Sequence, residues 1–142
     1  KKMIDKPVLR IKIEANGEPA HMFCRQGEVL MIPFRGYVES ELFKGIVLPC
    51  GVDTQIVNAA GVRSMSARYM MEGKDSDGQD CHIYIENNGW FDDRTKTMPF
   101  HTVPTIYTDS KCLAPYLNVN QFTGMGIERE DGLWIEFYEI EQ

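Results

Sequence analysis

The side chains with the clearest capacity for chemistry are a carboxylate and an arginine that stand within apolar segments. Asp53 lies at the entrance of a strand-like run in LPCGVDTQIV (48–57), and Arg68 lies in the middle of SARYMMEG (66–73). Asp often bonds the backbone N–H groups of a turn, and Arg is usually exposed to solvent. If Arg68 instead points inward, it would pair with Asp53 or Glu86 and anchor a ligand carbonyl or carboxylate.

A third segment, CHIYIENNGW (81–90), alternates as a β-strand does, so that Glu86 and the cysteine at its start fall on opposite faces. The hairpin that joins this segment to residues 62–72 has two possible registers. One register sets Arg68 opposite Glu86, the other sets Tyr69 opposite Glu86, and a slip of one residue exchanges the two faces. The connection contains too many turn residues to select a register from the sequence. We expect Glu86 to point inward.

Aromatic and amide side chains complete the candidate site. An apolar cavity with a few converging polar groups is what a small-molecule site requires. In a small barrel the same aromatic residues also serve as core or rim packing, because each covers a large apolar area. The candidate ligand-binding residues are Asp53, Arg68, Tyr69, Tyr84, Glu86, Asn88, Trp90 and Asn118.

The sequence lacks the motifs of the commonest metal sites and enzymes. Its three histidines are isolated, and the loop containing Asp75 and Asp77 does not have the spacing of a calcium-binding EF-hand. A G-x-S-x-G elbow and a glycine-rich nucleotide loop are both absent from the sequence. Its four cysteines form no C-x-x-C pair, and we expect free thiols. We therefore predict no metal and no cofactor, and the sequence leaves open whether the protein is an enzyme.

Strands must position these side chains, because the hydrophobic pattern has a period of two along almost the whole chain. Helical signals are confined to residues 109–117, where Pro115 limits a helix to a turn or two. The pairs Asn16-Gly17 and Asp131-Gly132 are strong hairpin signals. We expect strands at 8–14, 20–24, 53–57, 62–72, 81–88, 102–108, 121–129 and 133–141, with two more and a corner at Pro33 and Gly36 within 28–49.

Many short strands joined by Gly- and Asp-rich turns are typical of an all-β sandwich or barrel. Closure into a barrel suits consecutive hairpins and removes exposed strand edges. A chain of 142 residues fits one domain. We predict that residues 1–142 form a single closed antiparallel up-and-down β-barrel of eight to ten strands with at most one short helix.

Composition narrows the partners that this chain could have. Its formal net charge is -6 and its Lys and Arg residues are scattered, which argues against nucleic acid, because binding a phosphate backbone needs a basic stripe. We expect no membrane association, since no apolar run approaches the roughly 18–20 residues of a membrane-spanning helix. No signal peptide is recognisable, so we expect a cytoplasmic protein. The exposed strand surface and modest size favour a homodimer.

Taken together, the segments LPCGVDTQIV, SARYMMEG, IYIENNGW, YLN and FTGMGIE with LWIEFYEI resemble a bacterial family known as domain of unknown function 3237. The resemblance runs from about residue 8 to residue 140 and implies a barrel related to lipocalin-like, or calycin, barrels. The family usually has two glycines before the Asp, whereas Cys50 takes the first place here. The positions that match are Gly51, Asp53, Ala67, Arg68, Tyr69, Tyr84, Asn87, Gly89, Leu117, Asn118, Gly124 and Gly126.

Three functional hypotheses follow from these observations. The first is a barrel that binds a small molecule in its interior. The second is an enzyme of isomerase, cyclase or lyase type that performs acid/base chemistry on a small aromatic or polyketide-like compound in the same cavity. The third is a structural or oligomerisation module, whose barrel is so filled with side chains that no cavity larger than a few waters remains. A cavity carboxylate with a raised pKa would favour the enzyme over a carboxylate neutralised by Arg68.

Overall fold

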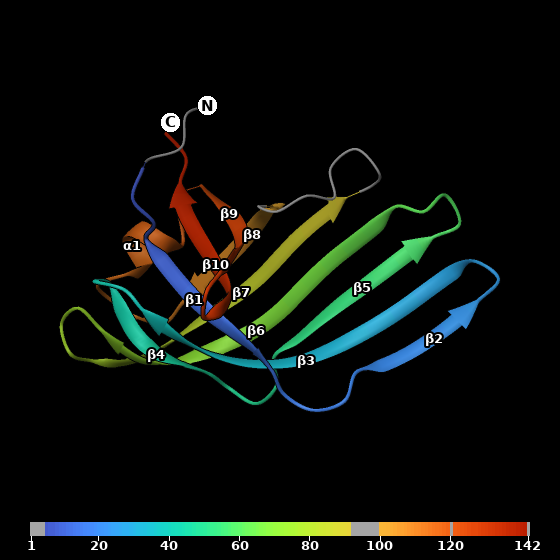
Figure 1. The fold of residues 1–142 in the computed structure, drawn as a ribbon. Helices are drawn as coiled ribbons and strands as arrows, with labels where there is room; N and C mark the ends of the chain where they lie inside the picture. Colours follow the sequence, from blue (N-terminus) through green and yellow to red (C-terminus); the bar gives the residue numbers. More distant parts are fainter. Residues whose placement is uncertain (1–4, 92–99, 120, 142) are drawn as a thin grey trace.

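The computed structural model describes residues 5–91, 100–119 and 121–141, and strands dominate it. Figure 1 shows the elements in chain order. The strands are β1 (Leu9–Ala15), β2 (Ala20–Cys24), β3 (Gly27–Glu39), β4 (Phe43–Val47), β5 (Val52–Asn58), β6 (Arg63–Asp75), β7 (Asp80–Phe91), β8 (Phe100–Thr108), β9 (Phe122–Arg129) and β10 (Gly132–Glu139), and a helix of 4 residues, α1 (Ala114–Leu117), precedes β9.

The strands close into an antiparallel barrel with 8 strand positions. β1 pairs with β10 on one side and with the C-terminal half of β3 on the other, which joins the two ends of the sheet. β4 and β5 share one position between β3 and β6. β2 pairs with β3 outside the closed ring. The prediction of a closed antiparallel barrel with one short helix is therefore confirmed.

β3 is one continuous strand, so the predicted corner at Pro33 and Gly36 is wrong. Pro33 has no N–H to donate, but its carbonyl oxygen accepts a hydrogen bond of 3.1 Å from the Asn16 N–H. At Gly36 the backbone of β1 passes so close that a Cβ would overlap the Lys12 carbonyl oxygen. The glycine thus permits close pairing of β3 with β1, and the chain turns later, at residues 40–42.

The two predicted hairpin turns have different outcomes. At Asn16-Gly17 the chain does turn, with a positive φ of 98° at the glycine, but β1 and β2 both pair with β3 instead of with each other. The reason is the length of β3, whose 13 residues provide backbone partners for both strands. Asp131-Gly132 closes the β9–β10 hairpin as predicted, with a φ of 120° at Gly132.

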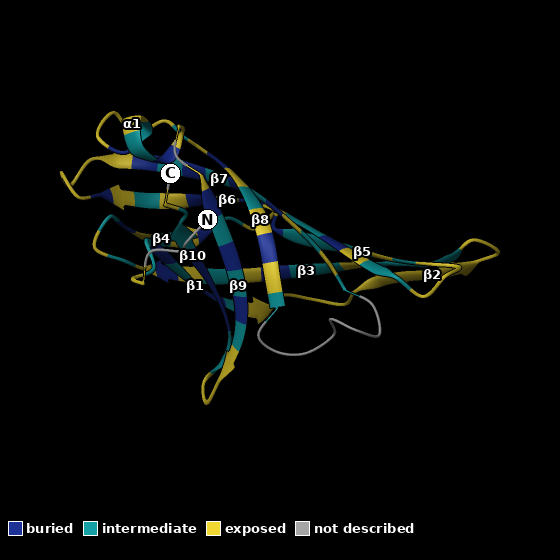
Figure 2. Cartoon of the chain, turned by 90° about the horizontal axis from the view of Figure 1, so that it is seen from above, coloured by how far each residue is buried: buried dark blue, intermediate teal, exposed yellow. Residues whose placement is uncertain are grey.

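The hydrophobic core lies inside the barrel, and α1 covers one end of it. Leu113 and Leu117 are buried there, and Pro115 occupies the first turn of the helix, where its missing N–H does no harm. Buried segments of the strands gather around this core in Figure 2. Within the described ranges, no helix is long and apolar enough to cross a membrane. The largest fully buried side chains are Phe43, Phe137, Leu9, Ile11, Met71, Ile83, Ile85 and Leu117.

Beyond the barrel, β2, β5 and the adjoining parts of β3, β6 and β7 continue as an open sheet, which projects to one side in Figures 1 and 2. All five residues of β2 are exposed. Because side chains alternate along each strand, one face of this extension continues the barrel interior and the other continues its exterior. Which face a residue occupies therefore decides whether it can contribute to an interior site.

Candidate functional site

The interior of the barrel contains a cavity of about 80 Å³ in the half that lies away from α1. Apolar side chains form most of its wall, and a few polar groups from β5, β6, β7 and β8 point into it. Its lining residues are Ile13, Phe34, Asp53, Met65, Ala67, Tyr69, Asn87, Phe100, Thr102, Leu133 and Ile135. This combination of an apolar wall and a few converging polar groups is typical of small-molecule sites.

Asp53 enters this cavity from the second position of β5. Its Oδ2 accepts a hydrogen bond of 2.7 Å from Gln55 Nε2, while its Oδ1 is buried without a partner in the described part of the chain. Burial raises the pKa of Asp53 above its ordinary value, although the Gln55 hydrogen bond and the positive charge of Arg63 oppose this shift. Asp53 is therefore a carboxyl group with increased basicity in an apolar setting.

Tyr69 faces the cavity from β6, and its phenol oxygen is also buried without a hydrogen-bond partner among the described residues. Its ring packs edge-on against Phe34, with 5.2 Å between the ring centroids and 76° between the ring planes. Burial raises the pKa of Tyr69 far above its ordinary value. The side chain is thus a neutral phenol held in a fixed orientation, with an O–H available to donate.

Asn87 and Thr102 add two further polar atoms to the same cavity. Asn87 Oδ1 and Thr102 Oγ1 are buried and have no hydrogen-bond partner within residues 5–91, 100–119 and 121–141. Gly124 of β9 lies directly beside Thr102, and a Cβ there would overlap the Thr102 hydroxyl. Nearly all buried polar groups in folded proteins are hydrogen-bonded. Four unpartnered polar atoms in one cavity therefore mark it as the strongest candidate site.

A chain of polar contacts leads from Asp53 onto the open sheet. Gln55, which donates to Asp53, accepts a hydrogen bond of 2.8 Å from Arg63 Nη1. Arg63 also lies 3.7 Å from Glu28, whose other carboxylate oxygen is 2.9 Å from His21 Nε2. Gln55 thereby holds the Asp53 carboxyl in place and leaves the second oxygen directed toward the cavity.

The register of β6 and β7 places Arg68 opposite Glu86, which is one of the two registers that the sequence allowed. Both side chains lie on the exterior, where Arg68 Nε contacts Glu86 Oε1 at 3.0 Å. Our expectation that Glu86 points inward is therefore wrong. Tyr69 and Asn87, the next residues along, occupy the inner face instead. Burying an aromatic ring is favourable whereas desolvating a charged pair is costly, so the parity that places Tyr69 inside and the Arg68–Glu86 pair outside is the more stable one.

The other predicted residues also lie outside the cavity. Tyr84 lies on the outer face beside Met70, and Trp90 is exposed. Asn88 donates a hydrogen bond of 3.4 Å to Glu86 on that same outer face. Asn118 binds the backbone of Thr108 through both of its side-chain polar atoms, at 2.9 and 3.3 Å, and so fixes the end of α1 to β8. Of the predicted set, the structure brings only Asp53 and Tyr69 together in the interior cavity.

Asn87 and Thr102 were not among the predicted site residues. A signal for Asn87 was present, since it shares the parity of the apolar residues Ile83 and Ile85 in IYIENN, and a polar residue on an apolar face is unusual. Thr102 carried no comparable signal. Threonine is common in strands, and only the pairing of β8 with β9 reveals that it faces the interior.

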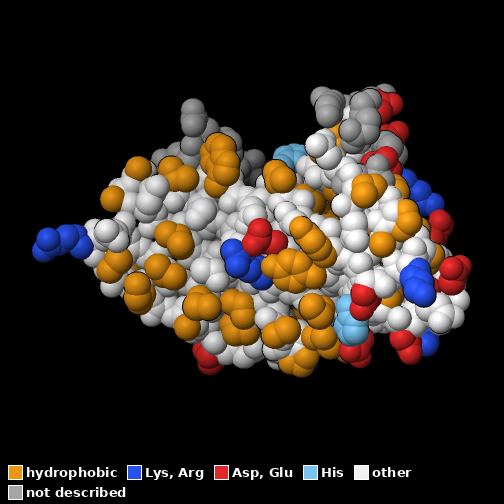
Figure 3. Space-filling view, turned by 180° about the vertical axis from the view of Figure 1, so that it is seen from behind, with side chains coloured by type: hydrophobic (Ala, Val, Ile, Leu, Met, Phe, Trp, Pro, Cys, Tyr) orange, Lys and Arg blue, Asp and Glu red, His pale blue; other side chains and the backbone are white. Residues whose placement is uncertain are grey.

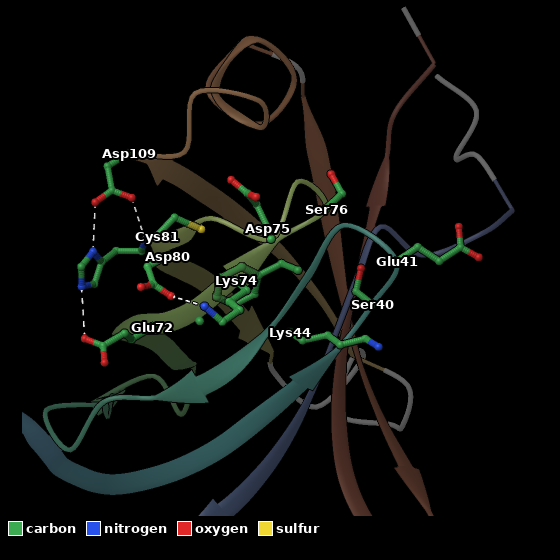
Figure 4. Close-up of a pocket in the computed structure, with 14 residues that line it drawn as sticks. Ser40, Glu41, Lys44, Glu72, Lys74, Asp75, Ser76, Asp80, Cys81 and Asp109 are labelled. Carbon is green, nitrogen blue, oxygen red and sulfur yellow. Dashed lines mark hydrogen bonds and ion pairs between the residues drawn. The ribbon is translucent and has the colours of Figure 1, made fainter.

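A second, larger hollow lies at the end of the β6–β7 hairpin, with a volume of about 980 Å³. Figure 4 shows its charged side chains, among them Lys44, Lys74, Asp75 and Asp109, with Lys74 paired to Asp80. Its buried carboxylate is satisfied: Asp75 accepts hydrogen bonds from Ser110 and from two backbone N–H groups of its own loop. Because these contacts secure the hairpin, we assign this hollow a structural role.

Metal ligands do not cluster in the part of the chain that the structure describes. Neither the cavity nor the Asp75-Asp77 loop brings together three or more His, Cys, Asp or Glu side chains in a manner that could hold a metal ion. The carboxylate of Asp75 is directed to the backbone N–H groups of Asp77 and Gln79.

The closed antiparallel barrel and its small interior cavity with a few polar groups place the chain among the small β-barrel proteins. Within that class, the chain belongs to the family described as protein of unknown function (DUF3237), which it matches over residues 6–140. The family resemblance drawn from the sequence is thereby confirmed.

Comparison with known proteins agrees with this assignment. An uncharacterised UPF0311 protein of Clostridium acetobutylicum is 34% identical over 97 residues, which are 68% of this chain and 52% of that protein, so the chain spans about half the length of this relative. A crystal structure of a C. acetobutylicum protein of unknown function is 31% identical, with a TM-score of 0.79 over 99% of this chain and 100% of that chain. A structure described as an enzyme from Penicillium herquei is 17% identical, with a TM-score of 0.70 over 96% and 92% of the two chains.

Proposed function

We propose that the barrel interior binds a small, neutral organic molecule with an apolar body and an oxygen-bearing polar end. The observation that carries this proposal is the convergence in one apolar cavity of four buried polar atoms that have no hydrogen-bond partner in the described part of the chain, from Asp53, Tyr69, Asn87 and Thr102. An unsatisfied buried polar group costs about 1–3 kcal/mol. A protein that keeps four such groups in one place gains stability when a ligand pairs with them.

The charges around the cavity favour a neutral ligand over an anion. Arg68, which the sequence offered as an anchor for a carboxylate, is paired with Glu86 on the exterior. Within the described lining, Asp53 is the charged group, and it would repel an anionic ligand. A hydroxyl group or carbonyl can pair with the Tyr69 O–H, the Asn87 amide and the Thr102 hydroxyl.

The size of the cavity limits what it holds without rearrangement. A volume of 80 Å³ accommodates two or three waters, which the structural hypothesis also expects, or the polar end of a larger compound, since water occupies roughly 30 Å³ in the liquid. Pockets for drug-sized ligands have about 300–1,000 Å³. A larger ligand therefore requires the side chains of Met65 and Phe100 in the cavity wall to move. Methionine adapts readily to such changes.

The binding proposal is tested with a matched pair of variants on opposite faces of β7. A panel of fragment-sized phenols, cyclic ketones and amides, together with carboxylated analogues, is screened by ligand-observed NMR. We expect neutral members to bind and carboxylates to fail. Asn87→Leu should weaken binding about tenfold, since a lost hydrogen bond in a dry site is worth about 1.5 kcal/mol, while Asn88→Leu should bind as the wild type does. Equal binding by both variants would contradict the proposal.

Tyr69→Phe gives a second prediction, in which stability and binding change in opposite directions. Removal of an unpartnered buried hydroxyl should stabilise the ligand-free protein by about 1 kcal/mol in urea unfolding. The same change should reduce affinity for the fragments found above. Tyr84→Phe on the exterior serves as the control and should change neither quantity. A destabilised Tyr69→Phe variant would show that the hydroxyl has a structural partner and would remove it from the site.

Proton-transfer catalysis is a second candidate function, favoured by the environment of Asp53. Its pKa is raised by burial, and Arg68 does not neutralise it, which is the condition that favours an enzyme over a simple binding protein. Asp53 would abstract a proton adjacent to a carbonyl, and the Tyr69 O–H would donate to the enolate oxygen that develops. An isomerase, cyclase or lyase needs no more than these two groups. That a protein of similar fold is described as an enzyme is compatible with this candidate.

The catalytic candidate is tested on compounds that bind. Solvent hydrogen exchange at carbon is followed by NMR in ²H₂O for each bound ketone, with wild type, Asp53→Asn and Glu86→Gln. We expect exchange with the wild type and Glu86→Gln, and loss of at least about 100-fold with Asp53→Asn, the range typical of general bases. If the compounds bind but none of the three proteins catalyses exchange, the enzyme hypothesis is rejected and the binding proposal stands.

A further inference from the structure

The outer face of the sheet carries an unusual number of exposed apolar side chains. Val103, Tyr107 and Trp90 are 69%, 65% and 58% exposed, and Met31, Ile56 and Met70 are also exposed. We call these six residues the apolar face. Figure 3 views the molecule from behind, where hydrophobic side chains spread across the surface around contacting basic and acidic groups. We propose that a second copy of this chain binds the apolar face through a two-fold interface centred near Arg68 and Glu86.

Strand registers place these residues on one continuous surface. Arg68 pairs with Glu86 across β6 and β7, and Glu86 pairs with Thr105 of β8. Two residues along in one direction, Met70, Tyr84 and Tyr107 form the next row across the same three strands. Since side chains separated by two residues share a face, both rows point outward.

The opposite direction along the strands is also apolar. Asn88 of β7 pairs with Ser66 of β6 and with Val103 of β8. One row further, Trp90 pairs with Ser64, which in turn pairs with Ile56 of β5. Apolar side chains therefore lie on both sides of the Arg68–Glu86 pair. A two-fold axis through that pair would lay each apolar flank on the opposite flank of the other copy.

The extent of this surface suits a dimer. A fully exposed aromatic or large aliphatic side chain presents on the order of 150–250 Å². Six such side chains, each a third to two-thirds exposed, present several hundred Å² of apolar surface, which is the range that marks interaction sites on soluble proteins. A standard interface buries about 800 Å² on each partner. Methionine and aromatic residues are enriched in interfaces, as they are on this face.

The charges on this face identify the partner as a second copy. Arg68 Nε lies 3.0 Å from Glu86 Oε1, and the Arg68 side chain is 66% exposed, so it remains accessible for further contacts. Because one basic and one acidic group lie side by side, rotation about a two-fold axis between them brings each opposite its complement in the other copy. The face is thus complementary to itself in both charge and hydrophobicity.

The test exchanges these charges between two variants. Sedimentation velocity of the wild type should show a dimer. Arg68→Glu alone places like charges across the axis, as does Glu86→Arg alone, and each should weaken self-association at least about tenfold. A mixture of the two single variants should form a one-to-one heterodimer, because each chain then presents the complement of the other. In each variant chain, positions 68 and 86 carry charges of the same sign. Only contacts between the two different chains can therefore restore assembly.

Control variants separate assembly from folding. Lys74→Glu reverses an exposed charge at the β6–β7 hairpin, away from the apolar face, and should remain dimeric. Val103→Ser should weaken the dimer while its circular dichroism spectrum and thermal unfolding of the monomer match the wild type. The proposal is overturned by a monomeric wild type, by single-charge variants that remain dimeric, or by a mixture without heterodimers. Binding of a monomer to phosphatidylcholine vesicles would identify a membrane as the occupant and would also overturn it.

Discussion

Asp53 connects the cavity to a measurable pH dependence. Burial raises the pKa of Asp53 in the folded state above the value in the unfolded chain. The folded state therefore holds the proton more tightly, so the stability from this group is fully present below the unfolded pKa of 3.8 and is lost as the pH rises through the raised value. Asn at this position has no proton to lose.

Comparison of the wild type with Asp53→Asn isolates this effect. We expect the free-energy difference between the two proteins, measured by urea unfolding, to shift in favour of the variant between pH 4 and pH 7. All other titrating groups are shared and cancel in the difference. A difference that does not change with pH would mean that Asp53 is solvated and not suited to act as a base.

Parity explains which site residues could be predicted at the residue scale. Asp53 and Tyr69 were recognised because a polar group at a strand entrance and a tyrosine in an apolar strand are informative by type. Arg68 and Glu86 were recognised as partners, but the same alternation fits either face, and only the closed sheet decides between them. Asn87 and Thr102 depend on strand pairing with distant segments, which a single sequence does not contain.

At the scale of elements, the contact between β8 and β9 limits the shape of the cavity. Gly124 faces Thr102, and a Cβ at Gly124 would overlap the Thr102 hydroxyl and lie 3.0 Å from the Phe137 ring. We expect Gly124→Ala to destabilise the protein by about 1–3 kcal/mol, the usual cost of overpacking a core. The double variant Gly124→Ala with Thr102→Ala should recover part of this loss in denaturant unfolding. Additive losses would place the strain elsewhere.

His82 connects three elements, and its protonation should affect how they hold together. Nδ1 of His82 lies 2.9 Å from Asp109, and Nε2 lies 3.3 Å from Glu72. The hydrogen bond to Asp109, with a smaller contribution from Glu72, raises the pKa of His82, although desolvation opposes the shift. Because the folded pKa exceeds the unfolded value of 6.5, this stabilisation is present below pH 6.5 and is lost as the pH rises through the folded value.

His82→Gln tests this arrangement. The melting temperature of the variant should fall below that of the wild type at pH 6, and the gap should narrow by pH 9. When Asp109→Asn is added to both proteins, the difference between their melting temperatures at pH 6 should become smaller, because Asp109 makes the larger of the two interactions with His82. A gap that widens with increasing pH would show that the neutral imidazole, and not the cation, stabilises the β7–β8 connection.

Element positions followed from the sequence more closely than element pairings. Alternating hydrophobicity located most strands to within a few residues, and Pro115 limited α1 to one turn. The pairing of β1 and β2 with β3 was missed, since the Asn16-Gly17 turn suits a hairpin locally. Local turn chemistry specifies a change of direction, whereas the partner of each strand depends on barrel closure.

At the scale of the whole molecule, the closed barrel and the open sheet extension have different properties. The polar groups of the cavity lie inside the barrel, away from the end that α1 closes. The extension provides the outer surface that includes Met31, Ile56 and Trp90. The proposed ligand site and the proposed dimer interface therefore lie on opposite faces of the same strands, β5, β6 and β7.

This shared use of strands has a thermodynamic consequence. A ligand that binds the folded state raises its stability by about 2.7 kcal/mol at a concentration 100 times its dissociation constant. Tyr69 and Asn87 lie on β6 and β7, so a bound ligand would contact two of the strands that carry the proposed dimer interface.

The central claim is that a ligand binds to the four buried polar atoms in the barrel interior, which have no partner among the described residues. Its most direct test is a high-resolution crystal structure of the protein after soaking with the tightest-binding neutral fragment from the NMR screen. We predict electron density for the fragment within the cavity, with its oxygen atom within hydrogen-bond distance of at least two of Asp53, Tyr69, Asn87 and Thr102. A cavity closed by side chains, or fragment density confined to the exterior, would contradict the account.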